Sequence, residues 1–153
     1  MFLSDIVFIV DETESQIPYM PIVRANIAKI CRRLVRSPDV DVRFCIITFR
    51  DYEPNNRHVS NAVRVYQFTN DIDVVQYTLS TLRPFGGGDG PEAQTPALYN
   101  ALKVAWNEDA QKVVILVTDS PPHGIGEDRD DYPHKRSPDG NLLLLLRHGE
   151  LLT

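Results

Sequence analysis

The sequence has few of the features that mark secreted, membrane-spanning or nucleic-acid-binding proteins. Its 153 residues include only two cysteines, which favours reduced, buried thiols over a disulfide or a zinc site. No apolar run approaches the roughly 18 residues of a spanning helix, and no signal-peptide pattern precedes the first strand-like run. The net charge of -5 disfavours binding to phosphate backbones. We therefore expect an intracellular, cytoplasmic protein with no nucleic-acid or membrane partner.

The chain does contain an alternation of apolar, strand-like runs and amphipathic, helix-like runs. Strands are predicted at residues 6–10, 40–49, 62–68 and 112–117. Helices are predicted from Pro18 to about 36, with Ile30 on the apolar face, and from 70 or 71, either of which could cap the helix, to about 82. Two more are predicted from about 93 to 107, with Ala105 pointing inward, and from 142 to 146. This alternation is typical of a mostly parallel sheet covered on both faces. The predicted fold is a single α/β domain over residues 1–153, Rossmann-like, with three α/β/α layers.

Acidic and hydroxyl side chains follow the buried strands, where ligands gather in parallel sheets. Asp11, Thr13 and Ser15 come directly after the first strand. The glycine-rich stretch 85–92 carries Asp89 and Glu92, and Asp119 follows the last strand with Thr118 and Ser120 beside it. Oxygen ligands without sulfur suit Mg²⁺, Mn²⁺ or Ca²⁺. Helix capping and turn formation also explain single residues of this kind, so the prediction of a metal site depends on their conjunction.

The order of three motifs resembles that of von Willebrand factor type A domains. Asp11-x-Thr13-x-Ser15 is similar to the first loop of their metal-ion-dependent adhesion site, and residues 88–92 (Gly-Asp-Gly-Pro-Glu) to a second metal loop. Residues 117–124 (Val-Thr-Asp-Ser-Pro-Pro-His-Gly) resemble the third. The combination most resembles the type A domains associated with α-kinases, with a second loop like that of integrin β-type A domains. The resemblance covers roughly residues 5–140.

The resemblance implies a metal-dependent module that binds a partner protein. Its implied ligands for Mg²⁺ (or Mn²⁺ or Ca²⁺) are Asp11, Thr13, Ser15, Glu92 and Asp119, while Asp89 would serve a neighbouring metal or orient the site. A vacant position on the ion would accept an acidic residue of the partner. Two departures concern the ligands: Thr13 replaces the usual Ser, and the usual second-loop Thr gives way to an acidic pair.

The C-terminal region departs from the resemblance as well. Type A domains continue with at least one more strand and helix after the third loop, whereas residues 142–153 could form little more than one short helix. We therefore expect a domain that lacks its last strand and helix. A truncated structural remnant without ligand binding is one alternative function.

Enzymatic and nucleotide-binding functions each have some support in the sequence. Asp11 could be a phosphoryl-accepting nucleophile, as in haloacid dehalogenase-like phosphatases, but these need an acid two residues later, where Thr13 stands. A metal-dependent hydrolase could use His123 as its base, although a structural or capping role is the commoner explanation for a histidine in a Pro-Pro-His-Gly turn. The glycine-rich stretch could hold a phosphate, but it lacks the Lys-Ser/Thr of a P-loop. We expect a protein that is not an enzyme.

Overall fold

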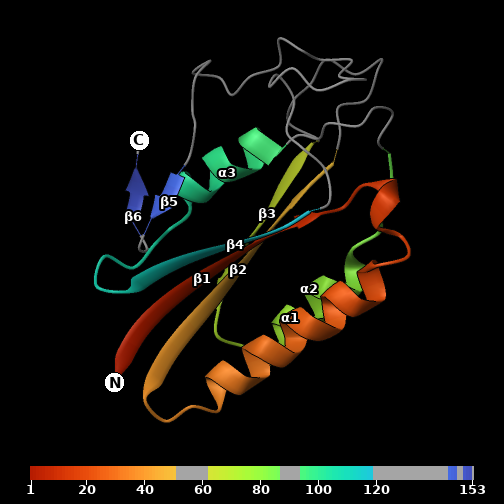
Figure 1. The fold of residues 1–153 in the computed structure, drawn as a ribbon. Coiled ribbons are helices and arrows are strands. Elements are labelled where there is room, and N and C mark those ends of the chain that lie inside the picture. The colour runs from red at the N-terminus through yellow and green to blue at the C-terminus, as the bar shows by residue number, and fades with distance from the viewer. Residues whose placement is uncertain (51–61, 87–93, 119–144, 148–149, 153) are drawn as a thin grey trace.

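A computed structural model describes residues 1–50, 62–86, 94–118, 145–147 and 150–152 (Figure 1). All structural statements below concern these residues. The elements in chain order are β1 (Phe2–Asp11), the 3₁₀ turn η1 (Glu14–Gln16), α1 (Met20–Val35), β2 (Val40–Phe49), β3 (Val63–Thr69), α2 (Ile72–Thr81), α3 (Gln94–Lys103), β4 (Gln111–Val117), β5 (Leu145–Arg147) and β6 (Glu150–Leu152).

The main sheet has four strands in the order β3-β2-β1-β4. Strand β1 is parallel to both of its neighbours, β2 and β4, while β3 is antiparallel to β2. The predicted mostly parallel sheet is confirmed. Strand β1 is buried from Asp5 to Asp11, because it has a hydrogen-bonded strand on either side and helices on both faces.

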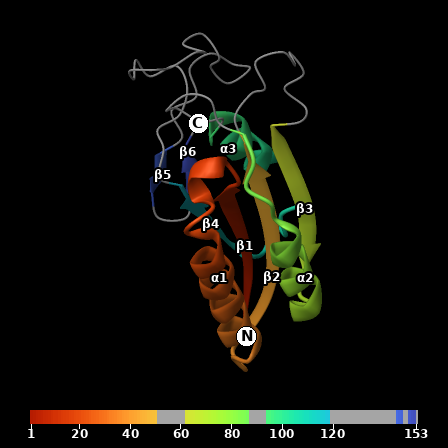
Figure 2. The same ribbon diagram turned by 90° about the vertical axis from the view of Figure 1, so that its right-hand side faces the viewer.

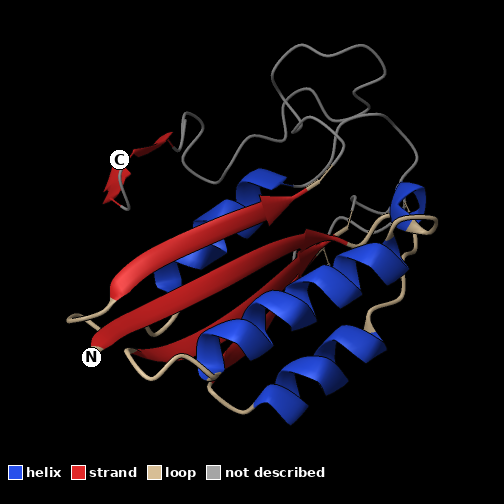
Figure 3. Cartoon of the chain, turned by 60° about the horizontal axis from the view of Figure 1, so that its bottom comes forward, coloured by secondary structure: helices blue, strands red, loops and turns tan. Residues whose placement is uncertain are grey.

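Alternate residues of β1 belong to two different cores, as the twofold period of a strand requires. Ile6, Phe8 and Val10 pack in one cluster with residues of α1 and α2. Val7 and Ile9 pack in the other with Ala97 and Ala101 of α3. Figures 1 and 2 show α1 and α2 on one side of the sheet and α3 on the other, and Figure 3 shows the same three layers. The expected α/β/α arrangement is therefore confirmed.

Helix boundaries and faces differ from the expectation in detail. Helix α1 begins at Met20, so the proline of its first turn is Pro21 and not Pro18. The side chain of Ile30, expected on the apolar face, is 40% exposed. Asp71 caps α2 as predicted, because its carboxylate accepts from the backbone N–H of Asp73 at 2.8 Å. None of the described helices is long and apolar enough to cross a membrane.

Helix α3 is shorter than its sequence pattern suggested. It ends at Lys103 instead of residue 107, and Ala105, predicted to point inward, is exposed. Ala97 and Ala101 are buried and pack against the sheet, together with the partly buried Leu98. The small alanines at these positions bring the helix close to the face of β1 and β2.

The predicted helix at 142–146 is wrong for the residues that the structure describes there. Residues 145–147 form β5, which pairs with β6 as an antiparallel two-stranded sheet. Residues 142–146 are all leucine, and a short apolar run without alternation fits helix and strand equally. Residues 119–144 lie outside the described part of the chain, so the absence of the last strand and helix of the domain stays a prediction.

Candidate metal centre

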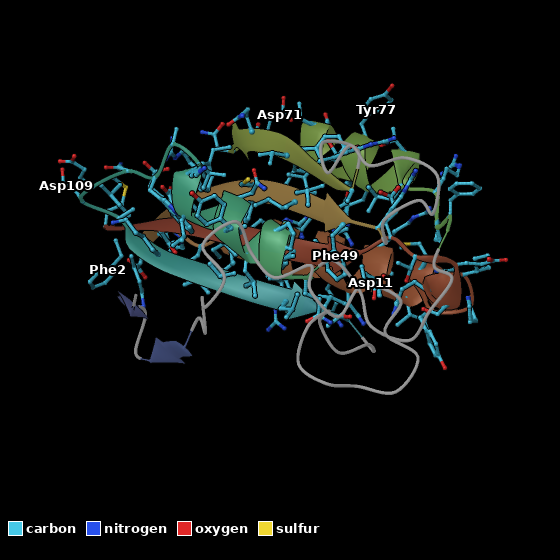
Figure 4. The ribbon with its side chains drawn as sticks, turned by 90° about the horizontal axis from the view of Figure 1, so that it is seen from above. Phe2, Asp11, Phe49, Asp71, Tyr77 and Asp109 are labelled. Carbon is cyan, nitrogen blue, oxygen red and sulfur yellow. The ribbon has the colours of Figure 1, made fainter. Side chains whose placement is uncertain are left out.

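The centre of the candidate site is Asp11, the last residue of β1. Its carboxylate is buried, with 1% of the residue exposed. Oδ1 accepts from the backbone N–H of Thr13 at 2.9 Å and from the Thr13 hydroxyl at 2.5 Å. Oδ2 accepts from the hydroxyl of Thr118 at 2.8 Å. Figure 4 shows Asp11 beside Phe49 and far from Phe2, which places it at the carboxyl edge of the parallel strands.

Strand register explains why Thr118 meets Asp11. Val117, at the end of β4, lies opposite Val10 in the parallel pairing, so the next residue of each strand extends to the same edge. The side-chain amide nitrogen Nε2 of Gln94, the first residue of α3, donates to the Thr118 hydroxyl at 3.3 Å. The beginning of α3 therefore lies at the same edge. Gln94 was not predicted, because a buried glutamine at a helix start has no sequence signature.

Hydroxyl groups extend the cluster toward the surface. The Oγ atoms of Thr13 and Ser15 lie 3.2 Å apart. Thr13 is buried, whereas Ser15 is exposed. The structure thus brings Asp11, Thr13 and Ser15 together as predicted, in a series that begins at a buried carboxylate and ends at solvent. The hydroxyl end of this series therefore lies at the surface among the described residues.

The donor set suits a hard divalent cation. A carboxylate and three hydroxyl oxygens, those of Thr13, Ser15 and Thr118, gather within hydrogen-bonding contact of one another. A hydroxyl that donates to a carboxylate still has lone pairs for a cation, and it can rotate its hydrogen away. Oxygen ligands of this kind are preferred by Mg²⁺, Mn²⁺ and Ca²⁺. The residues present therefore fit such an ion.

The remaining predicted ligands are Asp89, Glu92 and Asp119, which lie outside the described residues. The described part of the chain holds no group of three or more His, Cys, Asp or Glu side chains that could bind a metal. It supplies the hydroxyl-rich half of the expected site with a single carboxylate, Asp11. If Glu92 is a ligand, we expect its carboxyl oxygen to lie within about 6 Å of the Asp11 and Asp119 carboxylates, close enough for one ion to bridge them.

The two cysteines take no part in this site. Cys31 of α1 and Cys45 of β2 are free thiols with no exposed surface, which confirms the expectation of buried thiols. Burial raises the pKa of each thiol to about 12, so both stay protonated at neutral pH. A protonated thiol is a poor metal ligand.

A model of the von Willebrand factor A domain family matches residues 5–128. The chain belongs to this family. The matched region contains β2, β3 and β4, β1 from Asp5 onward, and the described part of the candidate site. It ends within the segment that follows β4, so it covers all three sequence motifs.

Similar proteins of known name or structure agree with this membership. The alpha-protein kinase vwkA of Dictyostelium discoideum is 30% identical over 133 residues, which is 84% of this chain and 20% of that protein. The pilus adhesin SpaC of Lactobacillus rhamnosus GG has the same fold, with a TM-score of 0.63 and 19% identity over 80% of this chain and 15% of SpaC.

A third similar protein is the proximal thread matrix protein 1 of the mussel byssus. Its TM-score is 0.62 at 23% identity, over 81% of this chain and 30% of that protein. The structure of that protein has a zinc-occupied metal-ion-dependent adhesion site (MIDAS) motif. Structural similarities at such low sequence identity show the fold alone. The chain spans only a fifth of the length of the kinase that it matches.

Proposed function

We propose that this type A domain binds one divalent cation at Asp11 and uses it to hold a partner protein. The observation that carries the proposal is the buried Asp11 carboxylate with the Thr13, Ser15 and Thr118 hydroxyls gathered around it. Burial of an ionised carboxylate is costly without compensating charge or hydrogen bonds. A cation at this point offsets that cost better than neutral hydroxyls do.

The proposed ligands are Asp11, Thr13 and Ser15 from the first loop, Glu92 from the second and Asp119 from the third. Asp89 orients the site or binds a second ion. Asp119 directly follows Thr118, whose hydroxyl contacts Asp11, and Glu92 lies two residues before Gln94, whose side chain contacts Thr118. The contacts of Thr118 and Gln94 support this choice of ligands, because these two residues lie one and two positions from Asp119 and Glu92 in the sequence.

The proposed ligand of the ion is an acidic side chain of a partner protein. Thr13 and Ser15 contribute neutral oxygens, which leave positive charge on the ion for a carboxylate to neutralise. Ser15 is exposed, so the ion would be reachable from that side. Type A domains are adhesion or protein-interaction modules, as the pilus adhesin among the similar structures illustrates.

Two features disfavour an enzymatic function. A phosphatase of the haloacid dehalogenase type needs an acid at position 13, but Thr13 uses its hydroxyl as a donor to Asp11 and cannot act as an acid at neutral pH. The second feature is the depth of Asp11, which is 1% exposed and so is not placed to attack a phosphoester. His123 lies outside the described residues.

Thermal unfolding with and without Mg²⁺ or Mn²⁺ tests the proposal. An ion at about 100 times its Kd stabilises the folded state by about 2.7 kcal/mol, which corresponds to a rise in Tm of about 5–10 °C for a chain of this size. Asp11→Asn should abolish the rise. Glu14→Gln is the matched control, because Glu14 is an exposed carboxylate in the same loop. A Tm of the unmutated protein that does not respond to millimolar metal would refute the proposal.

A further inference from the structure

Glu12 follows Asp11 in sequence, just beyond the end of β1, but its carboxylate has different neighbours. The Asp11 carboxylate contacts Thr13 and Thr118. The Glu12 carboxylate contacts Arg50, which follows β2, and Arg83, which follows α2. The two consecutive carboxylates therefore connect to different parts of the fold.

The Glu12 side chain is buried, with 1% of the residue exposed. Its Oε1 accepts from the backbone N–H of Arg83 at 2.8 Å and from Nη2 of Arg50 at 3.2 Å. Nη2 of Arg50 also donates to the carbonyl of Arg83 at 3.1 Å. Glu12 and Arg50 together therefore bind both backbone polar groups of the same residue, Arg83.

Backbone contacts continue this attachment along residues 82–86, here called the 82–86 segment. The N–H of Phe85 donates to the carbonyl of Glu12 at 3.0 Å, and the N–H of Glu14 donates to the carbonyl of Gly86 at 2.9 Å. Gly86 has a positive φ of 78°, which glycine adopts without strain. The guanidinium of Arg24, from α1, donates to the carbonyl of Leu82.

The 82–86 segment is therefore held by backbone contacts with the first loop and by three charged side chains. These are Glu12 of the first loop, Arg24 of α1 and Arg50 after β2. It leads directly into residues 87–93, which carry Asp89 and Glu92. We infer that Glu12 is a positioning residue: it holds the start of the glycine-rich loop against the Asp11 loop and thereby sets the affinity of the metal site without binding the ion. This inference rests on the proposed function.

A buried charge in this position does more than fill space. Oε2 of Glu12 and Nε of Arg50 have no hydrogen-bond partner among the described residues, so this buried ion pair leaves two polar atoms unsatisfied within that part of the chain. Apolar side chains of similar volume could replace a buried ion pair without lowering the stability of the fold. The carboxylate does what an apolar side chain cannot, because it accepts the Arg83 N–H and orients Arg50 onto the Arg83 carbonyl.

Glu12→Gln tests the inference with two measurements. The first is amide hydrogen exchange at Arg83 and Phe85 without metal, which should become about tenfold faster when the charged acceptor is lost, a change that corresponds to about 1.4 kcal/mol. The second is Mn²⁺ affinity, which should fall about 10–100-fold, as is usual when a group that orients metal ligands is removed. Glu14→Gln is the control, because it removes a neighbouring but exposed carboxylate; both quantities should stay as in the unmutated protein.

Arg50→Lys provides a second variant if Glu12→Gln fails to fold. It keeps the positive charge but loses the geometry that spans Glu12 and the Arg83 carbonyl, so exchange should be faster and affinity lower in the same direction. Unchanged exchange at Arg83 and Phe85 would overturn the inference, and so would faster exchange with unchanged Mn²⁺ affinity. If the unmutated protein binds no Mn²⁺, the proposed function fails and with it the effect on affinity, while the exchange data still decide whether Glu12 holds the segment.

Discussion

Asp5 lies in β1, toward the end opposite to the candidate metal centre. Its replacement should therefore lower the stability of the fold without changing the affinity for metal. The carboxylate is 1% exposed. It accepts from Nε and Nη2 of Arg43 at 2.9 and 2.6 Å and from the backbone N–H of Asn107 at 2.7 Å. Hydrogen bonding to Asp5 raises the pKa of Arg43 above its usual value. Asp5 therefore ties β2 and the segment after α3 to the central strand.

Asp5→Asn should lower the free energy of unfolding by about 3 kcal/mol. An asparagine oxygen in the place of Oδ2 keeps two of the three donors, Nη2 of Arg43 and the N–H of Asn107, as neutral hydrogen bonds, and leaves Nε of Arg43 facing an NH2 group. The lost hydrogen bond to a charged group costs about 1.5–3 kcal/mol, and each bond that becomes neutral loses about 1 kcal/mol. The sum is about 3.5–5 kcal/mol, and the 36% exposure of the Arg43 side chain lowers it, because water replaces part of the loss. Mn²⁺ affinity of the folded fraction should not change.

Urea unfolding measures this effect through the fluorescence of Trp106, the only tryptophan, whose ring lies 5.4 Å from that of Phe68 between centroids. Circular dichroism provides an independent probe. Asp41→Asn is the matched control, because Asp41 is an exposed carboxylate on β2 and should change stability by less than about 0.5 kcal/mol. A loss below about 1 kcal/mol for Asp5→Asn, or one equal to that of the control, would refute the reasoning.

Three further outcomes are expected. Phe44→Ala, at a residue 1% exposed, should cost about 3–5 kcal/mol in urea unfolding, whereas Phe2→Ala, at a residue 74% exposed, should cost little; equal losses would contradict the assigned core. The buried thiols, with pKa raised to about 12, keep their protons when exposed thiols lose theirs above about pH 8.5. Below about pH 8.5 the thiols should therefore not change the free energy of unfolding with pH. Between about pH 8.5 and pH 12 that free energy should fall by as much as about 1.4 kcal/mol per thiol for each pH unit. A double variant, Cys31→Ala with Cys45→Ala, that shows the same slope would contradict this. Finally, no metal-dependent turnover of a generic phosphoester is expected, and turnover that Asp11→Asn abolishes would reverse that expectation.

Three strands of the main sheet could be predicted to within one residue because their apolar, β-branched runs are continuous, and the interval 40–49 agrees with β2 at both ends. Strand β1 extends from Phe2 to Asp11, beyond the predicted 6–10. The rule that ligands gather where parallel strands end singled out Asp11, the last residue of β1. The helix ends were less accurate, because the pattern continued past Lys103 in α3 although Ala105 is exposed. The leucine run at 142–146 has no periodicity, so helix and strand could not be distinguished there.

The charged contacts could not be predicted at all. Asp5 and Glu12 look like ordinary polar residues in the sequence, yet each is buried against an arginine 38 positions away. Such pairs depend on the register between β1 and β2, in which Asp5 lies opposite Arg43. Register is determined by the whole hydrophobic pattern, so the partner of a single carboxylate is known only once the sheet is built.

The central claim, that Asp11 anchors a divalent cation, is tested most directly by counting bound Mn²⁺ at equilibrium. Electron paramagnetic resonance of free Mn²⁺ gives the number of ions per chain and their affinity in one titration. For the unmutated protein and for Glu14→Gln we predict one saturable ion per chain, or two if Asp89 binds a second ion. Folded Asp11→Asn should bind one ion fewer. Binding of Mn²⁺ by Asp11→Asn with unchanged number and affinity, or no saturable binding by the unmutated protein, would contradict the claim.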